Sequence, residues 1–590
     1  MTRTPPLSRL SRRSALLVSG AALSLLAGLP AALPSATASP APGGHEIRPP
    51  NQQQVDDLNP KELLNGAARP ATATLHVPVV RGTRVNQANG VSTRINGLTM
   101  KDQRTSNHGN SFSLEPPDQG LCVGNGYVIE AVNNVFSVYR TSGGRVSGPQ
   151  SLDPFWNHGT AEIIRHSDGT ATYGPFVSDP KCYFDPQLHR FFLTELQLGT
   201  DPSTGAFNGA SFERIAVSKG SRPTTRSRNW HLYSLNVRND GTQGTPSHPG
   251  CPCLGDQPLI GADRYGFYIT TNEFPISGPG FNGAQMYAFD KAALARGQMK
   301  VQRIESVNPP LAEGVAYSVQ PATSPTASQW STANNGTEYF LSALQFTGLL
   351  DNRIATWAMT NTASLRTAHP NVHVSNVVMS SEVYGAPPPA TQKNGPTPQA
   401  TALGDPENML QSNDDRMNQV VFADGRLWSG VNTIVQTRHD PQSVGLAYFV
   451  VSPSASSSGV TATMSHQGYL AVNQGSLLFP AIGVTPSGRA AMVFTLTGKN
   501  YFPSAAMVHL SRSGRLNSQI GVLAAGAVPA DGFTGYPQYG GNGSERWGDY
   551  SAAVAGPDGK VWLATEYIPG TFGYPDFIAN WGTYVASVMP

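Results

Sequence analysis

The sequence has few charged residues and no concentrated charge of either sign. Asp, Glu, Lys and Arg make up 13% of its 590 residues, against about 25% in ordinary soluble domains. The 40 basic residues nearly balance the 38 acidic ones. No Lys/Arg-rich run is present, so the patch that would neutralise nucleic-acid phosphates is lacking. Heptad repeats are also scarce, and we therefore predict neither a nucleic-acid partner nor a long helical bundle.

Long apolar runs are lacking after the N-terminal region. Residues 1–38 combine several arginines, an apolar run at 15–33 and the small-residue sequence Ala36-Thr37-Ala38, which is the pattern of a bacterial secretory signal peptide. The pair Arg12-Arg13 fits a twin-arginine signal, and an ordinary secretory signal is the alternative. No later run reaches about 18 apolar residues. We predict a secreted, extracellular protein with no membrane span.

Cysteine is rare, with four residues in the chain. In an exported protein these thiols are free to form disulfides. We expect the pairs Cys122–Cys182 and Cys251–Cys253, because Cys122 and Cys182 occupy matching positions in neighbouring repeats. A metal site formed by His248, Cys251 and Cys253 is the alternative.

Glycine and proline are plentiful, with 61 and 48 residues, which indicates a chain with many turns. Residues 39–111 show little periodicity apart from a strand-like stretch at 72–80. We interpret 39–111 as a flexible leader that lends one strand to the body of the protein. Residues 112–590 alternate short β-rich runs with turn residues and form that body.

A repeated hairpin pattern organises residues 112–590. Each repeat opens with an aspartate, turns near its midpoint and closes with Glu or Asn. The five repeats span 118–134, 179–195, 256–273, 415–432 and 549–566. Two further hairpins, at about 317–344 and 480–496, lack the carboxylates. Seven such units arranged radially predict an all-β, seven-bladed β-propeller, and six or eight blades are the alternatives.

Several short motifs resemble a family of secreted bacterial β-propeller exoproteins. The motifs are Glu115–Asp118, Ser178–Pro180, Leu259–Gly261, Thr271–Phe274 and Arg546–Ser551. This family has no settled activity, so the resemblance implies fold and export but no reaction. More distantly, the architecture resembles sialidase-like and arabinanase-like propellers, although the sequence has no Ser-x-Asp-x-Gly-x-x-Trp box.

The hairpin pattern also predicts a candidate site. A hairpin with a central turn places its ends side by side, and radial repetition gathers those ends at one mouth of the central channel. The candidate ligand-binding residues are Asp118, Asp256, Asp415, Asp549, Arg546, Trp547 and Tyr539. The candidate catalytic residues are Glu273, Glu566 and Asp179. The candidate metal ligands are Asp179, Asp256 and Asp549.

Carboxylates gathered in this way cannot all remain ionised without partners. A hard cation such as Ca²⁺ is one solution. Pairing with Lys181, Arg416 and Arg546 is a second solution. A split into one protonated and one ionised acid, as a glycosidase requires, is a third. The alternative to all three is a structural role in which each aspartate accepts backbone hydrogen bonds.

Two functions are compatible with these patterns. The first is recognition of an extracellular saccharide or cell-wall polymer by a monomeric propeller. The second is a carbohydrate-active enzyme, either a glycoside hydrolase or a polysaccharide lyase. A Gly-x-Ser-x-Gly elbow and a His-Glu-x-x-His motif are both missing, which argues against a serine hydrolase and a zincin.

Overall fold

The computed structural model describes residues 74–590 except 159–160, 305–310, 345–349 and 571. The chain divides into a unit of residues 1–44 and a unit of residues 45–590, and all described residues belong to the second unit. The predicted signal peptide at 1–38 and residues 39–73 of the predicted leader lie outside the described residues.

The described residues are dominated by strands, which confirms the all-β prediction. The helices are short. They are α3 (Met100–Thr105), α4 (Leu152–Phe155), α5 (Lys291–Ala295) and α6 (Pro398–Leu403). Among the described residues, no helix has the length and apolar character needed to cross a membrane.

The first three blades are separate four-stranded antiparallel sheets. Blade 1 contains β3 (Gln119–Gly124), β4 (Tyr127–Val132), β5 (Val135–Arg140) and β6 (Arg145–Ser151). Blade 2 contains β9 (Phe176–Asp185), β10 (Arg190–Thr200), β11 (Phe207–Ser218) and β12 (Trp230–Asn236). Blade 3 contains β13 (Cys253–Ala262), β14 (Gly266–Pro275), β15 (Gly283–Asp290) and β16 (Val301–Ile304).

Blades 4 and 5 share an eight-stranded sheet because their first strands, β17 and β22, pair in parallel. Blade 4 contains β17 (Gln320–Thr323), β18 (Thr337–Ala343), β19 (Asp351–Thr360) and β20 (His373–Tyr384). Blade 5 contains β22 (Val420–Ala423), β23 (Arg426–Val435), β24 (Ser443–Ser456) and β25 (Gly459–Leu470).

The last two blades each include a strand from the N-terminal part of the chain. Blade 6 contains β26 (Gly475–Val484), β27 (Ala490–Gly498), β28 (Tyr501–Leu510), β29 (Gln519–Ala524) and β1 (Arg84–Gln87). Blade 7 contains β31 (Ala552–Ala555), β32 (Val561–Tyr567), β33 (Gly582–Val588) and β2 (Val91–Thr99). Residues 84–99 of the predicted leader therefore supply two strands, whereas residue 79 in the expected strand 72–80 forms an isolated bridge to residue 436.

Two small elements lie outside the blades. Strands β7 (Ile163–Arg165) and β8 (Ala171–Tyr173) form a hairpin, and β21 (Met409–Leu410) pairs in parallel with β30 (Ser544–Glu545).

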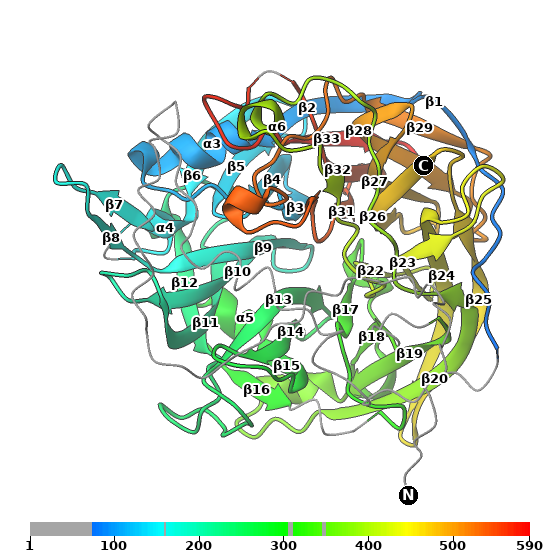
Figure 1. Ribbon diagram of the computed structural model, residues 1–590. Helices are drawn as coiled ribbons and strands as arrows, with labels where there is room; N and C mark the ends of the chain where they lie inside the picture. Colours follow the sequence, from blue (N-terminus) through cyan, green and yellow to red (C-terminus); the bar gives the residue numbers. More distant parts are fainter. Residues whose placement is uncertain (1–73, 159–160, 305–310, 345–349, 571) are drawn as a thin grey trace, which may run out of the picture. The chain divides into compact units, whose positions relative to one another are not determined.

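The blades form a closed ring around a common axis (Figure 1). The first strands follow one another in the order β3, β9, β13, β17, β22, β26 and β31, and each contacts the next. Strand β31 in turn contacts β3. At this seam β2, from the N-terminal side, pairs antiparallel with the C-terminal strand β33. The ring is therefore closed by backbone hydrogen bonds between segments that are far apart in the sequence, and few strand edges remain open.

Apolar side chains fill the spaces between neighbouring blades. At the seam, Ile95 of β2 and Val585 of β33 belong to the same buried cluster as Leu121 of β3. Both predicted disulfides are confirmed: Cys122–Cys182 joins blades 1 and 2, and Cys251–Cys253 closes a short loop at the start of β13.

We predict that Ile95→Ala lowers the free energy of unfolding by about 3 kcal/mol, because it removes a buried side chain from the seam and leaves a cavity. Ser92→Ala, on the exposed face of β2, is the matched control and should change it by less than about 0.5 kcal/mol. Chemical denaturation measures the free energy of unfolding of both variants. Equal changes in the two variants would show that the seam does not depend on the packing of Ile95.

Candidate functional site: the acidic mouth of the channel

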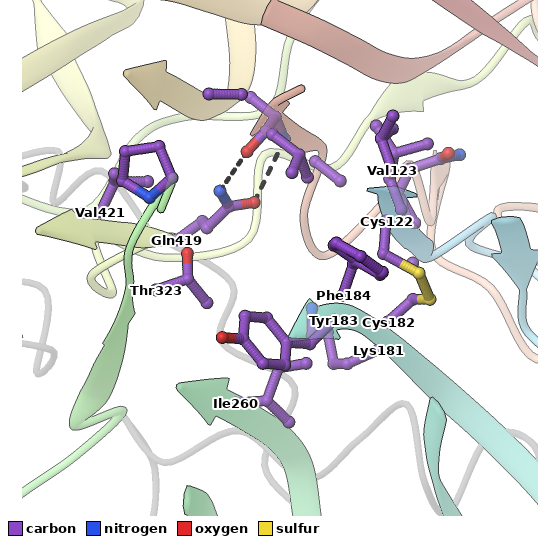
Figure 2. Close-up of a pocket in the computed structure, with 18 of the residues that line it drawn as sticks. Cys122, Val123, Lys181, Cys182, Tyr183, Phe184, Ile260, Thr323, Gln419 and Val421 are labelled. Carbon is purple, nitrogen blue, oxygen red and sulfur yellow. Dashed lines mark hydrogen bonds between the residues drawn. A yellow bond between two sulfur atoms is a disulfide. The ribbon is translucent and has the colours of Figure 1, made fainter. Parts of the chain in front are cut away.

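The first strands of the blades surround a cavity of about 140 Å³ on the propeller axis (Figure 2). Its walls are largely apolar and include Leu121, Ile260 and Val554. At the end where the first strands begin, polar side chains such as Lys181 and Gln257 replace the apolar ones. This polar end is the part of the channel where a hydrophilic ligand could be held.

We define the acidic mouth as Asp118, Asp179, Asp256, Asp414 and Asp549 together with Lys181, Arg416 and Arg546. These residues belong to or directly precede the first strands of blades 1, 2, 3, 5 and 7. Hydrogen bonds and mutual electrostatic effects link them to one another. The fold thus brings together Asp118, Asp179, Asp256 and Asp549, which the sequence predicts at a common mouth.

An unusual backbone conformation recurs at the start of the first strands. Asp179, Gln257 and Phe479 have φ angles of 60°, 49° and 56°, and a proline follows each of them. All three positions coincide with a shift in the register of the first strand against the second. Such bulges with a left-handed residue interrupt the regular alternation of side chains and re-aim them.

Blades 1 and 7 meet at the mouth through two aspartates. The backbone N–H of Asp549 donates a hydrogen bond of 2.8 Å to Oδ1 of Asp118. Burial, followed by the charges of Asp549 and Asp179, raises the pKa of the Asp118 carboxyl well above its usual range. Asp118 therefore has a structural role across the seam and adds an acid to the mouth as well.

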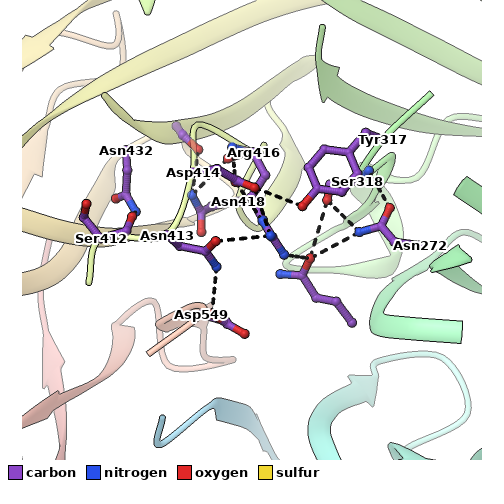
Figure 3. Close-up of polar contacts among 12 residues, drawn as sticks. Asn272, Tyr317, Ser318, Ser412, Asn413, Asp414, Arg416, Asn418, Asn432 and Asp549 are labelled. Atoms are coloured by element: carbon purple, nitrogen blue, oxygen red, sulfur yellow. Dashed lines mark hydrogen bonds and ion pairs between the residues drawn. The ribbon is translucent and has the colours of Figure 1, made fainter. Parts of the chain in front are cut away.

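A hydrogen-bond network centred on Arg416 joins blades 3, 4 and 5 (Figure 3). Arg416 forms a bidentate pair with Asp414, at 2.8 Å from Nε to Oδ1 and 2.9 Å from Nη2 to Oδ2. Its Nη1 donates to Oε1 of Gln257 at 2.6 Å. Tyr317, at the entry to blade 4, donates its hydroxyl to Asp414 Oδ2 at 3.0 Å. Asp414 and Arg416 thus satisfy each other, and the network fixes the geometry of this side of the mouth.

Asp549 and Asp256 have contrasting surroundings. Both Asp549 oxygens accept hydrogen bonds from Arg546 Nη2, at 3.0 and 2.9 Å, and Oδ1 also accepts one of 2.7 Å from Asn413. Asp549 therefore has one guanidinium group and one amide as hydrogen-bond donors. Asp256 accepts no hydrogen bond from the described residues, and burial, with the charge of Asp179 as the second cause, raises its pKa to about 8.

Lys181 of β9 lies among the aspartates. Its Nζ lies over the ring of Tyr550. Burial lowers the pKa of the Lys181 amine well below its usual range, although Asp118, Asp179 and Asp549 oppose this shift. The Lys181 amine is therefore a hydrogen-bond donor in the mouth that loses its proton at a lower pH than an exposed lysine does.

The predicted catalytic residues Glu273 and Glu566 lie in buried pockets between strands, with exposures of 1% and 0%. Glu273 accepts hydrogen bonds from Asn239, His248 and Asn282. Glu566 accepts one from Thr495, and burial raises its pKa to about 8. Neither side chain reaches the surface of the mouth, so of the three predicted catalytic residues only Asp179 is part of it.

The predicted aromatic contacts are also internal. Trp547 is 2% exposed and packs in a core cluster that includes Trp581, so its ring has no free face on which a sugar could stack. Tyr539 is half-buried against Phe533, with ring centroids 5.7 Å apart. Asp415 is fully buried.

The acidic mouth holds no tight metal-ligand cluster. Among the described residues, one group of three metal-ligating side chains has all its ligand atoms within 4.8 Å of one another, and this group is Cys251, Cys253 and Glu273. Asp179, Asp256 and Asp549 are more widely spaced than this, and Ca²⁺ binding there stays a prediction.

The sequence patterns did not point to Gln257, Asn413 or Tyr317 as part of the site. A signal was present for Gln257, because Gln257-Pro258 occupies the position that Asp179-Pro180 occupies in the preceding blade. Asn413 has a left-handed φ of 54° directly before the Asp414–Arg416 pair.

No protein-family model matches the sequence, and no curated protein matches it either. Among solved structures, Trypanosoma rangeli sialidase is similar over 72% of this chain and 57% of its own, with 11% identity and a TM-score of 0.32. An exo-β-1,3-galactanase from Clostridium thermocellum is similar over 84% of this chain and 96% of its own, with 9% identity and a TM-score of 0.27. At this level of similarity, the fold assignment rests on the strand pairing of this chain.

We predict that Glu566→Gln changes how stability depends on pH. A carboxyl with a pKa of about 8 in the folded protein and about 4.5 in the unfolded chain loses its stabilising contribution as the pH rises from about 4.5 to 8. The glutamine amide of the variant does not titrate, so the variant does not lose stability in this way. Between pH 4.5 and 8.5, the free energy of unfolding of the variant should therefore rise relative to that of the wild type by on the order of 4 kcal/mol.

Urea unfolding at a series of pH values measures this difference. Asp558→Asn, in an exposed turn, is the control and should follow the wild-type profile. Parallel profiles of Glu566→Gln and wild type would contradict a buried, protonated Glu566.

Proposed function

We propose that the protein binds a saccharide at the acidic mouth, and that it does so outside the cell, where its two disulfides are stable. The observation that carries this proposal is the alternation of donors and acceptors there. Asp549 and Arg546 keep 14% and 18% of their side-chain surface exposed, and Asp256, Asn413 and Lys181 are half-buried. Sugar hydroxyl groups both donate and accept, so they can bond to such a set.

The charge of the mouth favours a neutral or amino sugar. The mouth carries five aspartates and only three cationic side chains, one of which, Lys181, has a lowered pKa. Arg416 and Arg546 are each paired with an aspartate, and the Lys181 amine has a lowered pKa, so an acidic sugar would have no unpaired cationic side chain of the mouth to bind. An ammonium group could pair with the acids whose pKa burial raises, Asp118 and Asp256. Asp414 and Arg416 are occupied with each other, which leaves Asp256 and Asp549 as the principal acceptors.

Hydrolysis of a glycosidic bond is a second candidate, favoured by the contrast between Asp256 and Asp549. A glycosidase uses one protonated carboxyl as general acid and one carboxylate as base or nucleophile. Asp256, with its pKa raised to about 8, would donate a proton to the leaving oxygen. Asp549, which accepts hydrogen bonds from Arg546 and Asn413, would activate water or attack the anomeric carbon.

We predict that Asp549→Asn weakens saccharide binding about 10- to 100-fold, because it removes a charged acceptor from the mouth. Titration calorimetry with neutral oligosaccharides (xylose, glucose and galactose oligomers), glucosamine oligomers and uronic-acid oligomers makes the test. Binding of at least one neutral or amino oligomer is expected, with none of the uronic-acid oligomers. Asp558→Asn, in the exposed turn between β31 and β32, at the opposite end of β31 from Asp549, should bind like wild type. Failure of every oligomer to bind, or equal binding by Asp549→Asn, would refute the proposed site.

For the second candidate, we predict that Asp256→Asn lowers the release of reducing ends from the bound oligomer by about 10²- to 10⁴-fold, because the general acid is lost. Binding of that oligomer should persist in this variant, because asparagine keeps an acceptor oxygen and a donor at this position. Retained binding without cleavage separates catalysis from recognition. Binding by the wild type without any release of reducing ends would leave recognition as the function and exclude hydrolysis of that oligomer.

A further inference from the structure

A second cluster of reactive side chains lies away from the acidic mouth, at the start of blade 3. Cys251 and Cys253 flank Pro252 at the entry to β13, and Glu273 lies opposite on β14, where its Cα partner is Gly255. The ligand atoms of Cys251, Cys253 and Glu273 all lie within 4.8 Å of one another. Nδ1 of His248, from the preceding loop, is 2.7 Å from Oε1 of Glu273.

We infer that this cluster is a redox-gated zinc site. In the oxidised protein the two sulfurs are joined in a disulfide and cannot ligate a metal. Reduction of the disulfide supplies two thiolates beside Oε1 of Glu273, which lies within 4.8 Å of both sulfurs. Nδ1 of His248 contacts Oε1 but lies outside this group of three, so it must move toward the sulfurs to become the fourth ligand. Nitrogen, oxygen and sulfur donors in a four-coordinate set are those that Zn²⁺ prefers.

The distance from Cys251 to Glu273 agrees with a tetrahedral zinc centre, whereas the two sulfurs, bonded to each other in the oxidised protein, must separate to roughly 3.8 Å after reduction. Zinc bonds of about 2.3 Å to sulfur and 2.0 Å to oxygen place these two atoms roughly 3.5 Å apart. Sγ of Cys251 lies 3.8 Å from Oε1 of Glu273. The contact between Glu273 and His248 must widen by roughly 0.6 Å, since zinc separates two such ligands by about 3.3 Å. That contact is a hydrogen bond, which disappears when Nδ1 gives up its proton to coordinate.

Neighbouring amides already orient these ligands. Nδ2 of Asn282 donates to Oε1 of Glu273 at 2.9 Å and lies 3.7 and 3.6 Å from the sulfurs of Cys251 and Cys253. Asn239 donates to the other oxygen of Glu273. Amide donors placed in this way stabilise thiolate and carboxylate charge and fix the direction of the free lone pairs, as the outer ligand shell of metal sites does.

Reduction of the Cys251–Cys253 disulfide requires a two-electron reductant, such as a thiol or a phosphine. Two electrons from the reductant cleave the sulfur–sulfur bond, and two protons complete the thiols of Cys251 and Cys253. Zinc binding then releases those two protons to solvent, while the proton on Nδ1 of His248 moves through solvent to its Nε2. Glu273 remains a carboxylate throughout.

The test uses the full chain, reduced with a phosphine, which is itself oxidised to the phosphine oxide, and then equilibrated with zinc sulfate without oxygen. After desalting, metal analysis is expected to find one zinc per reduced chain and none per oxidised chain. Cys251→Ser and Cys253→Ser should each lose this zinc under the same conditions. The matched control is Cys122→Ser/Cys182→Ser, which removes the other disulfide and should retain one zinc.

Substitution with cobalt(II) gives a readout that does not depend on the folding of a variant. A site with two thiolates shows sulfur-to-cobalt charge-transfer absorption and the intense visible bands of tetrahedral cobalt. Their appearance only after reduction supports the inference. Uptake of zinc by the oxidised chain, equal uptake by Cys253→Ser, or cobalt spectra without thiolate bands would each overturn it.

Discussion

The pairing of β2 with β33 is the constraint on which the rest of the structure depends. It joins segments at opposite ends of the described chain and closes the ring of first strands around the channel. Across the same seam, the N–H of Asp549 donates to the carboxyl of Asp118. The acidic mouth therefore exists because the ring is closed, since an open arc of blades would leave Asp549 and Asp118 apart.

Closure of the ring forces several carboxylates into a small space, and the surroundings decide the state of each one. Asp414 is neutralised by the bidentate contact with Arg416, and Asp549 by Arg546. Asp256 has no such partner among the described residues, and its pKa rises accordingly. Burial excludes water from Asp256 and so disfavours its ionised form. For the same reason, a bound hydroxyl group could replace the remaining water there at little electrostatic cost.

The repeated hairpins and the convergence of their opening aspartates could be predicted from the sequence, because turn spacing fixes which residues begin each first strand. The positions of the side chains of the closing glutamates, Glu273 and Glu566, could not be predicted from the sequence. The Cα partner of Glu273 is Gly255 and that of Asp256 is Asn272, and a shift of one residue turns a side chain to the other face of a strand. The face of Gly255 points to blade 2, since a Cβ atom there would lie 3.1 Å from Oε1 of Glu213. Glu273 is therefore packed between blades rather than on the axis.

The same alternation separates two kinds of ligand chemistry along β13. Cys253 and Gly255 share one face of the strand, while Asp256 lies on the other, three residues from Cys253. The interblade face thus gathers sulfur, imidazole and one carboxylate around a disulfide, where amide donors from Asn239 and Asn282 support charge. The opposite face carries Asp256, whose carboxyl is influenced by the charges of Asp179 and Arg416 in the acidic mouth. A side chain can move from one face of β13 to the other only if the register of the strand changes. One short strand therefore positions residues of two sites that differ in chemistry.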